Sequence, residues 1–198
     1  MITREEALKF LSGKIENKNI IKHMIAAEAL MRALAAKLKA QNLNVKSEEK
    51  INEDEWAMVG LLHDGDYCEG VLPEKQGIQV VEWLREGGFE VPEAAAHAMA
   101  AHNWHNTGVE PQSLMDWALF CGDSLTGLIV AAALVLPSRK LADVNTDMIL
   151  RRFKELKFAA GTRREEIALC EEKFGLPLAE FVEISLKAMQ DISGDLGL

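Results

Sequence analysis

The chain has 198 residues, with 31 acidic and 22 basic side chains, so its formal net charge is −9. Its length suits one domain with a sizeable core, and its 48% share of hydrophobic residues excludes a wholly disordered chain. The acidic balance excludes a nucleic-acid polymer as the main partner, because phosphate backbones bind to basic faces. A small anionic substrate stays open, since a few local cations suffice to bind it.

Cysteine usage and hydropathy bear on the compartment. Cys68, Cys121 and Cys170 are widely spaced and form no CxxC pair, so we expect neither a disulfide framework nor a thiolate zinc site. The N-terminal segment MITREEALKFL has no apolar signal core. The longest apolar run, 125–136, is too short to span a bilayer and indicates a buried helix. We therefore expect a protein of the reducing cytoplasm with no membrane attachment.

Helical patterns begin at the N-terminus. Thr3 and Glu6 predict a capping box for a first helix that ends near Gly13. Apolar residues recur at helical spacing over 19–41, which predicts a long helix. A polar segment follows and is expected to be a surface loop over 42–54. The next predicted helix is short and apolar, and covers 54–63.

Prolines and capping residues mark the remaining helices. Four prolines are expected to open helices: Pro73 (to 86), Pro92 (to 102), Pro111 (to 136) and Pro177 (to about 193). Asn145 or Thr146 caps a predicted helix to about 157, and Thr162 with Glu165 predicts a capping box for a helix ending at Gly175. Strand patterns and repeats are essentially absent. The predicted fold class is therefore all-α, as a single domain over 1–198.

Ionisable residues inside the apolar helices point to chemistry. His63 and Asp64 end the apolar run WAMVGLL, and Asp123 lies among apolar residues. A buried lone carboxylate is costly unless it is paired or metal-bound, and imidazole with carboxylate suits Mn, Fe, Co, Ni or Zn. Adjacent helical residues point about 100° apart, so the pair can bind one ion only near the helix end, where Gly65 interrupts the run. Further ligands must come from other helices, and His23 and Asp123 are the candidates.

Each candidate also has a structural alternative. His23 can be a hydrogen-bonded core histidine, which is common on an apolar helix face. Asp123 can accept hydrogen bonds from neighbouring hydroxyls such as Ser124 or Thr126. The histidine–aspartate pair at 63–64 can be an ordinary helix C-terminus. Spacing alone therefore leaves the metal hypothesis open.

The order of these residues resembles a known family. His23, then the pair at 63–64, then Asp123, each on a helix, resemble the HD-domain superfamily of metal-dependent phosphohydrolases. The flanking segments are similar to its small bacterial branch of predicted hydrolases: IIKHMIAAEALMRALA, WAMVGLLHDGDY, PEKQG, AMAAHN and ALFCGDSLTGLIVAAALV. The resemblance implies an HD-domain-like helical core over 18–137. The tail RRFKELKFAAGTRREEI also resembles that branch, and 145–198 is expected to be a C-terminal helical extension packed on the core.

The resemblance also implies a site and a reaction. It makes His23, His63, Asp64 and Asp123 the ligands of one divalent metal ion per chain, which is Mn, Fe, Co, Ni, Zn or Mg. In such sites the ion polarises a phosphoryl oxygen and lowers the pKa of a bound water that attacks phosphorus. The expected function is thus a metal-dependent phosphohydrolase acting on a small phosphorylated molecule, for example a nucleotide. Asp64 belongs to its catalytic site.

Two departures from the family pattern bear on this expectation. Binuclear members carry further histidines, one of which precedes the proline that corresponds to Pro73, and this chain has Leu72 there. A second metal site is therefore not expected. Nucleotidase members often carry a glutamate acid/base shortly after the pair, where this chain has Gly65, Asp66 and Tyr67. Asp66 becomes a candidate acid/base, although a loop aspartate is more often a turn residue.

Other residues are candidates for substrate contact. His102 ends AMAAHN, which resembles a family segment that lines the site, so we expect it to hold a phosphate oxygen or protonate a leaving group. Its alternative is a wet loop shared with His105, and the spacing of His97 indicates a structural role. Lys75 follows the site segment and is a candidate to bind an anionic substrate. A solvated basic face is the expected setting of the cations in the tail: Lys154, Lys157, Arg163 and Arg164.

Two other classes of protein compete with the hydrolase. A metal- and nucleotide-binding sensor with little turnover is favoured by the missing glutamate. An iron oxygenase usually needs a fuller ligand set for two metals, which Leu72 argues against. The substrate, the physiological metal and the oligomeric state do not follow from the sequence.

Overall fold

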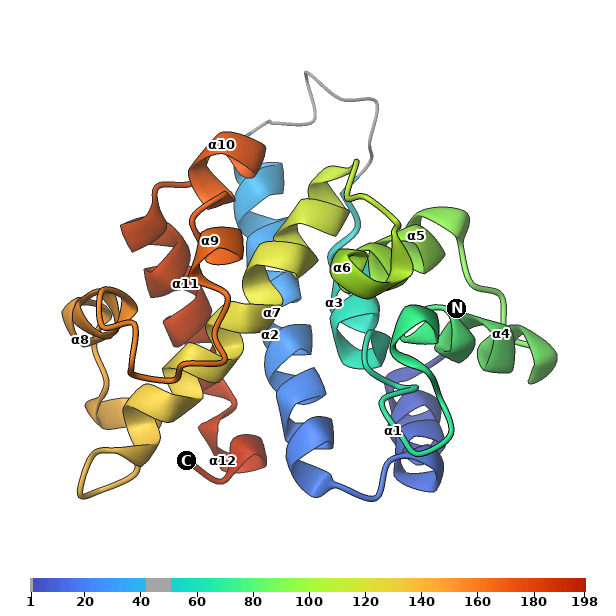
Figure 1. Ribbon diagram of the computed structural model, residues 1–198, viewed down its shortest axis with the longest axis horizontal. Helices are drawn as coiled ribbons and strands as arrows, with labels where there is room; N and C mark the ends of the chain where they lie inside the picture. The colour runs from blue at the N-terminus through green and yellow to red at the C-terminus, as the bar shows by residue number, and fades with distance from the viewer. Residues whose placement is uncertain (1, 42–50) are drawn as a thin grey trace.

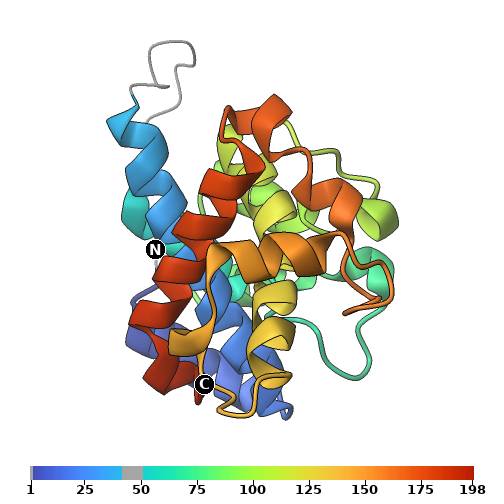
Figure 2. The same ribbon diagram turned by 90° about the vertical axis from the view of Figure 1, so that its left-hand side faces the viewer.

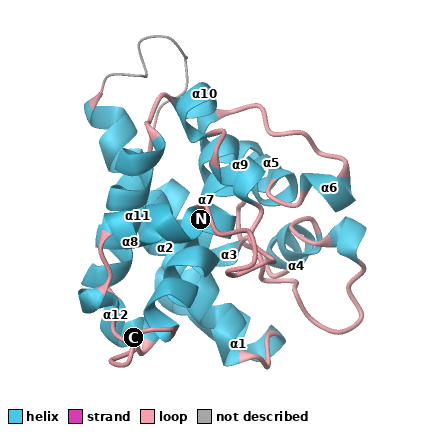
Figure 3. Cartoon of the chain, turned by 60° about the vertical axis from the view of Figure 1, so that its left-hand side comes forward, coloured by secondary structure: helices cyan, strands magenta, loops and turns pink. Residues whose placement is uncertain are grey.

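The computed structural model describes residues 2–41 and 51–198 (Figure 1). Within these ranges the chain forms helices joined by loops and turns, and contains no strand (Figure 3). The all-α fold class predicted from the sequence is confirmed. Residues 42–50, which make up most of the predicted surface loop, lie outside the described residues.

The described helices follow one another with short connections. Their bounds are α1 (Arg4–Lys14), α2 (Lys18–Ala40), α3 (Glu53–Leu62), α4 (Gln79–Glu86), α5 (Glu93–Ala101), α6 (Trp104–Thr107), α7 (Leu114–Leu134), α8 (Thr146–Phe153), α9 (Arg164–Ile167), α10 (Cys170–Phe174), α11 (Leu178–Asp191) and α12 (Ser193–Leu196). Two short 3-10 helices, η2 (Pro73–Lys75) and η3 (Leu141–Asp143), lie in the connections.

Several helix starts follow from local sequence chemistry as predicted. Thr3 and Glu6 form the capping box of α1, each side chain bonding to the backbone N–H of the other. Asn145 caps α8 with its side-chain oxygen. Pro92 and Pro177 directly precede α5 and α11, as the missing proline N–H and its restricted φ favour.

Two predicted boundaries on the way to the central helix are wrong. The helix predicted over 73–86 is divided into η2 and α4, because Gly77 adopts a φ of +84°, which lies outside the helical region. The central helix begins at Leu114 and not at Pro111. Ser113 caps it, since its hydroxyl accepts from the backbone N–H three residues on.

The C-terminal part departs from the prediction around Arg164. This side chain is only 8% exposed, so it is not part of the expected solvated basic face. Its guanidinium donates hydrogen bonds to backbone carbonyls that cluster around it: those of Arg152, Phe153, Glu155, Phe158, Ala159 and Thr162. The turn after α8 wraps around this guanidinium, so α8 ends at Phe153 and does not reach the predicted end near residue 157. Thr162 contributes its carbonyl in place of a side-chain cap, and the helix predicted over 162–175 forms as α9 and α10.

The two long helices α2 and α7 cross in contact in the middle of the molecule, and α3 packs against α2 (Figure 1). Glycines make these contacts close. A Cβ atom on Gly60 of α3 would lie 2.5 Å from the backbone oxygen of Ala27 on α2. A Cβ atom on Gly122 of α7 would lie 2.6 Å from Cδ2 of Leu30, also on α2. Both α3 and α7 therefore approach α2 near the residues that end up in the site.

The C-terminal helices cover one side of this pair. Figure 2 shows α11 lying along the core, and α11 contacts both α2 and α7. Within the described ranges, α7 is the one helix long and apolar enough to cross a membrane, because it extends the apolar run 125–136 toward the N-terminus, but 61% of its most apolar window is buried inside the protein. A core helix of a soluble protein has this character, so the fold is compatible with a soluble protein.

Candidate metal centre

Five side chains selected from the sequence meet at one place. They come from the second turn of α2, from the turn that follows α3, from the end of α5 and from the middle of α7. The set includes all four of the expected metal ligands together with one further histidine: His23, His63, Asp64, His102 and Asp123. We call these five residues the His/Asp cluster. Its ligand atoms form two overlapping groups, each within 4.8 Å, which share His63.

Four atoms of the His/Asp cluster face one another. Nε2 of His23 lies 2.8 Å from Oδ1 of Asp123, 3.2 Å from Nε2 of His63 and 3.6 Å from Oδ2 of Asp64. Nε2 of His63 lies 3.5 Å from that same Oδ2 and 3.6 Å from the same Oδ1. Neighbouring ligands on an ion with bonds of about 2.1 Å are about 3.0 to 3.4 Å apart. The five distances that involve an imidazole nitrogen lie near this range, and Asp64 and Asp123 fall in separate ligand groups. The two imidazole nitrogens and the carboxylates beside them are therefore placed to share one ion.

The other ring nitrogens of these two histidines are held from behind. Nδ1 of His63 lies 2.8 Å from the carbonyl oxygen of Gly60, and Nδ1 of His23 lies 3.0 Å from the Thr126 hydroxyl. That hydroxyl donates to the main-chain carbonyl of Asp123, so it accepts from His23. Both Nδ1 atoms thus carry a proton, so Nε2 is the ring atom of each histidine that faces the cluster and can bind a cation.

The structural alternatives for Asp123 are not what the chain adopts. Thr126 contacts the main-chain carbonyl of Asp123 and not its carboxylate. Ser124 points its hydroxyl to Glu166. The carboxylate of Asp123 is directed to the imidazoles, with His23 as its nearest partner.

His102 stands beside the four-atom set. It is buried, so the wet loop considered for it is wrong. Its Nδ1 bonds to the carbonyl of Met99, and its Nε2 lies 3.4 Å from Oδ1 of Asp64, the oxygen that the other ligands do not share. The ring meets that of His63 edge to face at 4.8 Å. Asp64 therefore links the expected ligands on one side to His102 on the other.

The electrostatics of the cluster suit a cation. Burial acts to lower the pKa of His63 and of His102, but the carboxylates of Asp64 and Asp123 outweigh it and raise the pKa of both. Burial acts to raise the pKa of the two carboxyls, but the imidazoles outweigh it: the pKa of Asp64 is lowered and that of Asp123 lies well below its usual range. The cluster thus holds ionised carboxylates in a buried place, which favours a positive partner.

Asp66 lies in a different setting from its neighbour Asp64. Its side chain is fully buried, and its oxygens accept from the backbone N–H groups of Gly77 (2.9 and 3.0 Å) and Val80 (2.8 Å). Gly77 lies just before α4 and Val80 lies in its first turn, so Asp66 satisfies backbone donors at the start of that helix from outside it. Burial raises the pKa of this carboxyl more than the backbone donors lower it. With both oxygens engaged, the arrangement favours a structural role over the expected acid/base role.

Lys75 lies in η2 with an exposed side chain. Its segment is tied to the end of α5, since Nδ2 of Asn103, the residue after His102, donates to the carbonyl of Pro73 at 2.9 Å. The connection places η2 next to the cluster segment. It leaves Lys75 accessible to an anionic substrate.

The remaining histidines lie outside the cluster. Nδ1 of His97 bonds to the buried carboxylate of Asp116 at 2.8 Å, as its predicted structural role requires. Nε2 of His105 bonds to Glu166 at 2.7 Å. Neither histidine shares a ligand group with the expected metal ligands.

A pocket of about 430 Å³ adjoins the cluster at His23, between α2 and α7. Its wall includes Thr126 and Lys22, two residues that the sequence reasoning did not assign to the site. The sequence spacing could have identified Thr126 as a site residue. It follows Asp123 by about one helical turn, so the two side chains share one face of the helix. Lys22 carries no comparable signal, since cations are common on helix surfaces.

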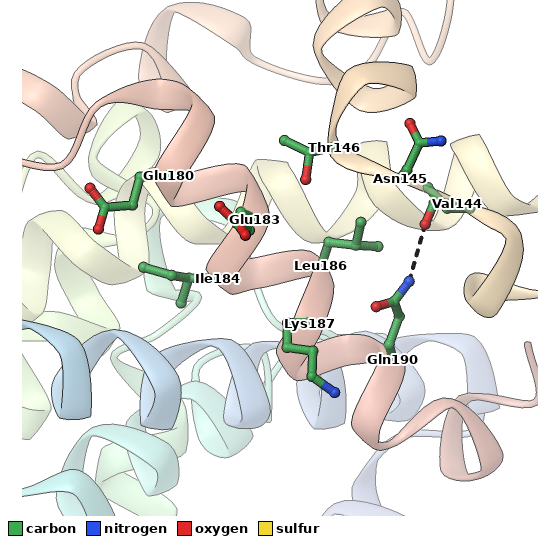
Figure 4. Close-up of a pocket in the computed structure, with 9 residues that line it drawn as sticks. All are labelled: Val144, Asn145, Thr146, Glu180, Glu183, Ile184, Leu186, Lys187 and Gln190. Carbon is green, nitrogen blue, oxygen red and sulfur yellow. Dashed lines mark hydrogen bonds between the residues drawn. The ribbon is translucent and has the colours of Figure 1, made fainter.

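A larger groove of about 550 Å³ lies elsewhere, between the start of α8 and α11 (Figure 4). Glu180, Glu183 and Lys187 border it on α11, and Gln190 crosses to the carbonyl of Val144. No residue of the His/Asp cluster lines this groove. Its size therefore does not make it the candidate site.

Comparison with known protein families, curated proteins and solved structures gives no match for this chain. The His/Asp cluster, its supporting hydrogen bonds and the pocket beside it are therefore the basis for any functional inference. Fold class alone would not suffice, because all-α bundles host many unrelated functions.

Proposed function

We propose that the chain is a metal-dependent phosphohydrolase that acts on a small phosphorylated molecule, for example a nucleotide. One observation supports this above the others: the two imidazole nitrogens lie 3.2 Å apart, and each lies 2.8 to 3.6 Å from both carboxylate oxygens. Mixed nitrogen and oxygen donors suit Mn, Fe, Co, Ni or Zn better than Mg, which prefers oxygen ligands. The proposed ligands of one ion per chain are His23, His63, Asp64 and Asp123.

A divalent ion bound there would polarise a phosphoryl oxygen and make a water molecule more acidic. The protein's own groups supply orientation and proton handling. Gly60 and Thr126 hold the imidazoles of His63 and His23 in one tautomer. Asp64 contacts the ligand set through Oδ2 and His102 through Oδ1.

His102 is the proposed proton-transfer residue. Its Nδ1 is engaged by the Met99 carbonyl, so Nε2 is the atom at which a proton is taken up or released. That atom lies at the edge of the ligand set, where it can hold a phosphate oxygen or protonate a leaving group. Lys75 is the proposed substrate-binding cation from η2. For Asp66 we propose a structural role in place of the acid/base role, because its oxygens accept from backbone N–H groups at the start of α4.

The proposed compartment is the cytoplasm. The three cysteines, Cys68, Cys121 and Cys170, are free thiols, and the last two are buried. Free thiols are typical of proteins kept in a reducing compartment. The acidic net charge of −9 fits a small phosphorylated partner bound at a local site better than a nucleic-acid polymer.

A phosphatase screen tests the proposal. The protein is stripped of metal, reloaded separately with Mn, Co, Ni, Mg or Zn, and offered nucleotides, sugar phosphates and simple phosphate esters. Phosphate release that requires the metal is the expected result. Absence of release with every metal and every ester would contradict the proposal.

A metal-containing sensor with little turnover is the second candidate. It is favoured by Asp66, because the carboxylate nearest after the ligand pair is committed to backbone donors and cannot replace the family's acid/base. Nucleotide binding that depends on metal but releases no phosphate would favour this candidate. Calorimetry on the same metal-loaded samples separates the two.

A further inference from the structure

The pocket beside His23 extends the candidate site in one direction. It runs between α2 and α7 from His23 and Thr126 at the cluster end to Leu134, a distance of about 12 Å along α7. The segment around α12 closes it on a further side, where α12 lies against α2 (Figure 1). Its volume of about 430 Å³ lies within the usual range for small-molecule pockets.

The lining of this pocket is mainly apolar. Ala26, Val130, Leu134 and Leu196 contribute hydrocarbon surface to its wall. The Thr126 hydroxyl is already engaged by His23 and by a backbone carbonyl, so it has no free proton for a ligand. Asn19 and Lys22 are the other polar side chains of the wall besides His23. These are too few to replace the hydrogen bonds that a sugar with several hydroxyl groups makes to water, whereas an apolar ring or chain loses none on entering.

One glycine in the pocket wall is not needed for close helix packing. Gly127 lies within α7 and lines the pocket. A Cβ atom placed on it would meet nothing within 4 Å, in contrast to Gly122 on the same helix. Glycine inside a helix costs about 1 kcal/mol relative to alanine. Because no neighbouring atom requires a glycine at this position, what Gly127 provides is open space in the pocket.

One cation belongs to the same pocket. Lys22 is half-buried on α2 next to His23, and within the described part of the chain it has no ion-pair partner within 4.0 Å. Its ammonium group lies on the α12 side, where a Cβ atom on Gly197 would meet it at 2.9 Å, and it gives the pocket a positive charge. This polarity suits a ligand with an anionic end and an apolar body.

Building on the proposed function, we propose that this pocket binds the organic group of the substrate and selects phosphate esters with an apolar or aromatic group over sugar phosphates. The phosphate would lie at the His/Asp cluster, and the apolar body would extend between α2 and α7 toward Leu134. Gly127 is then a specificity-determining residue, because it lines the pocket at an exposed position of α7 and a large side chain there would reach into the space of the ligand.

Binding of two non-hydrolysable probes tests this proposal. Inorganic phosphate and phenylphosphonate are titrated calorimetrically into the metal-loaded protein, and into its Gly127→Leu and Gly13→Leu variants. Gly13 is the matched control, since it is an exposed helical glycine on α1 whose Cβ would also meet nothing within 4 Å. The melting temperature of each variant is measured alongside, and we expect no loss, because leucine favours a helix over glycine.

We expect the unaltered protein and Gly13→Leu to bind phenylphosphonate about tenfold or more tightly than phosphate, because the ring buries apolar surface. Gly127→Leu should remove this preference and change the affinity for phosphate by less than about twofold, since the cluster is untouched. A preference that is absent from the unaltered protein, or that survives in Gly127→Leu, would overturn the pocket assignment. If the protein in that case still bound phosphate and cleaved esters in a metal-dependent reaction, the proposed hydrolase function would stand without the pocket assignment. Binding of neither probe would overturn both.

Discussion

Nε2 of His23 on α2 lies 2.8 Å from Oδ1 of Asp123 on α7, and the Thr126 hydroxyl joins the two residues from behind. One helical turn of α7 thus supplies both an expected ligand and the group that orients another. Nε2 of His63 lies 3.2 Å from the same His23 nitrogen. Residues from α2, from the turn after α3 and from α7 therefore converge at Nε2 of His23, which lies at the centre of the proposed site.

Removing the Thr126 hydroxyl should weaken metal binding. Thr126→Val keeps the shape of this buried side chain but takes away the acceptor for Nδ1 of His23. Groups that orient a metal ligand are typically worth about 10- to 100-fold in metal affinity. The affinity is measured by competition with a chelator.

Two controls accompany the Thr126 variant. Thr126→Ser should retain the affinity, because it keeps the hydroxyl, and Thr107→Val removes a hydroxyl that bonds only to backbone outside the cluster. An affinity unchanged by Thr126→Val would remove the orienting role.

Replacing His102 should separate metal binding from turnover. His102→Ala is expected to keep the ion, because its Nε2 faces the Asp64 oxygen that is not shared with the other ligands. Its kcat should fall by about 10² to 10⁴, the usual range for acid/base assistance. Metal content and kcat are measured on the same samples, with His105→Ala as the control outside the cluster. Loss of the ion would make His102 a ligand, and activity within a few-fold of the unaltered protein would remove its proton-transfer role.

Asp66→Asn should affect stability and spare the chemistry. An amide NH₂ would face one of the backbone N–H groups that the carboxylate now accepts from, at Gly77 and Val80. Leaving such a buried donor unsatisfied costs about 1 to 3 kcal/mol, or roughly 3 to 10 °C in Tm for a chain of this size. Thermal unfolding measures the change, and kcat is compared below the Tm. An unchanged Tm with kcat abolished would restore Asp66 as the acid/base.

Metal binding should strengthen as the pH rises from about 6 to 8. In the metal-free fold the carboxylates raise the pKa of His63 above its ordinary value of about 6.5, so a proton occupies Nε2 at lower pH. The stabilisation linked to that proton is present below the unfolded pKa and is lost as the pH rises through the folded pKa. The ion replaces the proton, so the rise in Tm on adding Mn should be larger at pH 8 than at pH 6. An increase that is equal at both pH values would contradict this competition.

The sequence made the order of the expected ligands visible because each one interrupts a local apolar pattern. His23, the pair at 63–64 and Asp123 stand out within single helices, and helix periodicity is a local property. Their meeting depends on tertiary packing. Gly60 and Gly122 let α3 and α7 approach α2 closely, and neither glycine differs in local sequence from a weak helix position.

Two other settings that the local sequence does not reveal have the same physical origin. Arg164 looks like one of several tail cations, and only the folded chain shows its guanidinium surrounded by carbonyls of the preceding turn. Asp66 looks like a turn residue or an acid/base, whereas its partner at Gly77 lies across a loop. Periodicity does not encode such contacts between segments, so their consequences for α8, α9 and α4 were beyond sequence reasoning.

The metal content of the protein is the most direct test of the His/Asp cluster. Mn is added to stripped protein, excess ion is removed, and the bound ion per chain is counted by mass spectrometry for the unaltered protein, Asp64→Ala and the exposed control Asp54→Ala. One ion per chain is the predicted result for the unaltered protein and for the control, and close to none for Asp64→Ala, with the helical circular dichroism of all three alike. Equal metal content in Asp64→Ala and the unaltered protein would contradict the site.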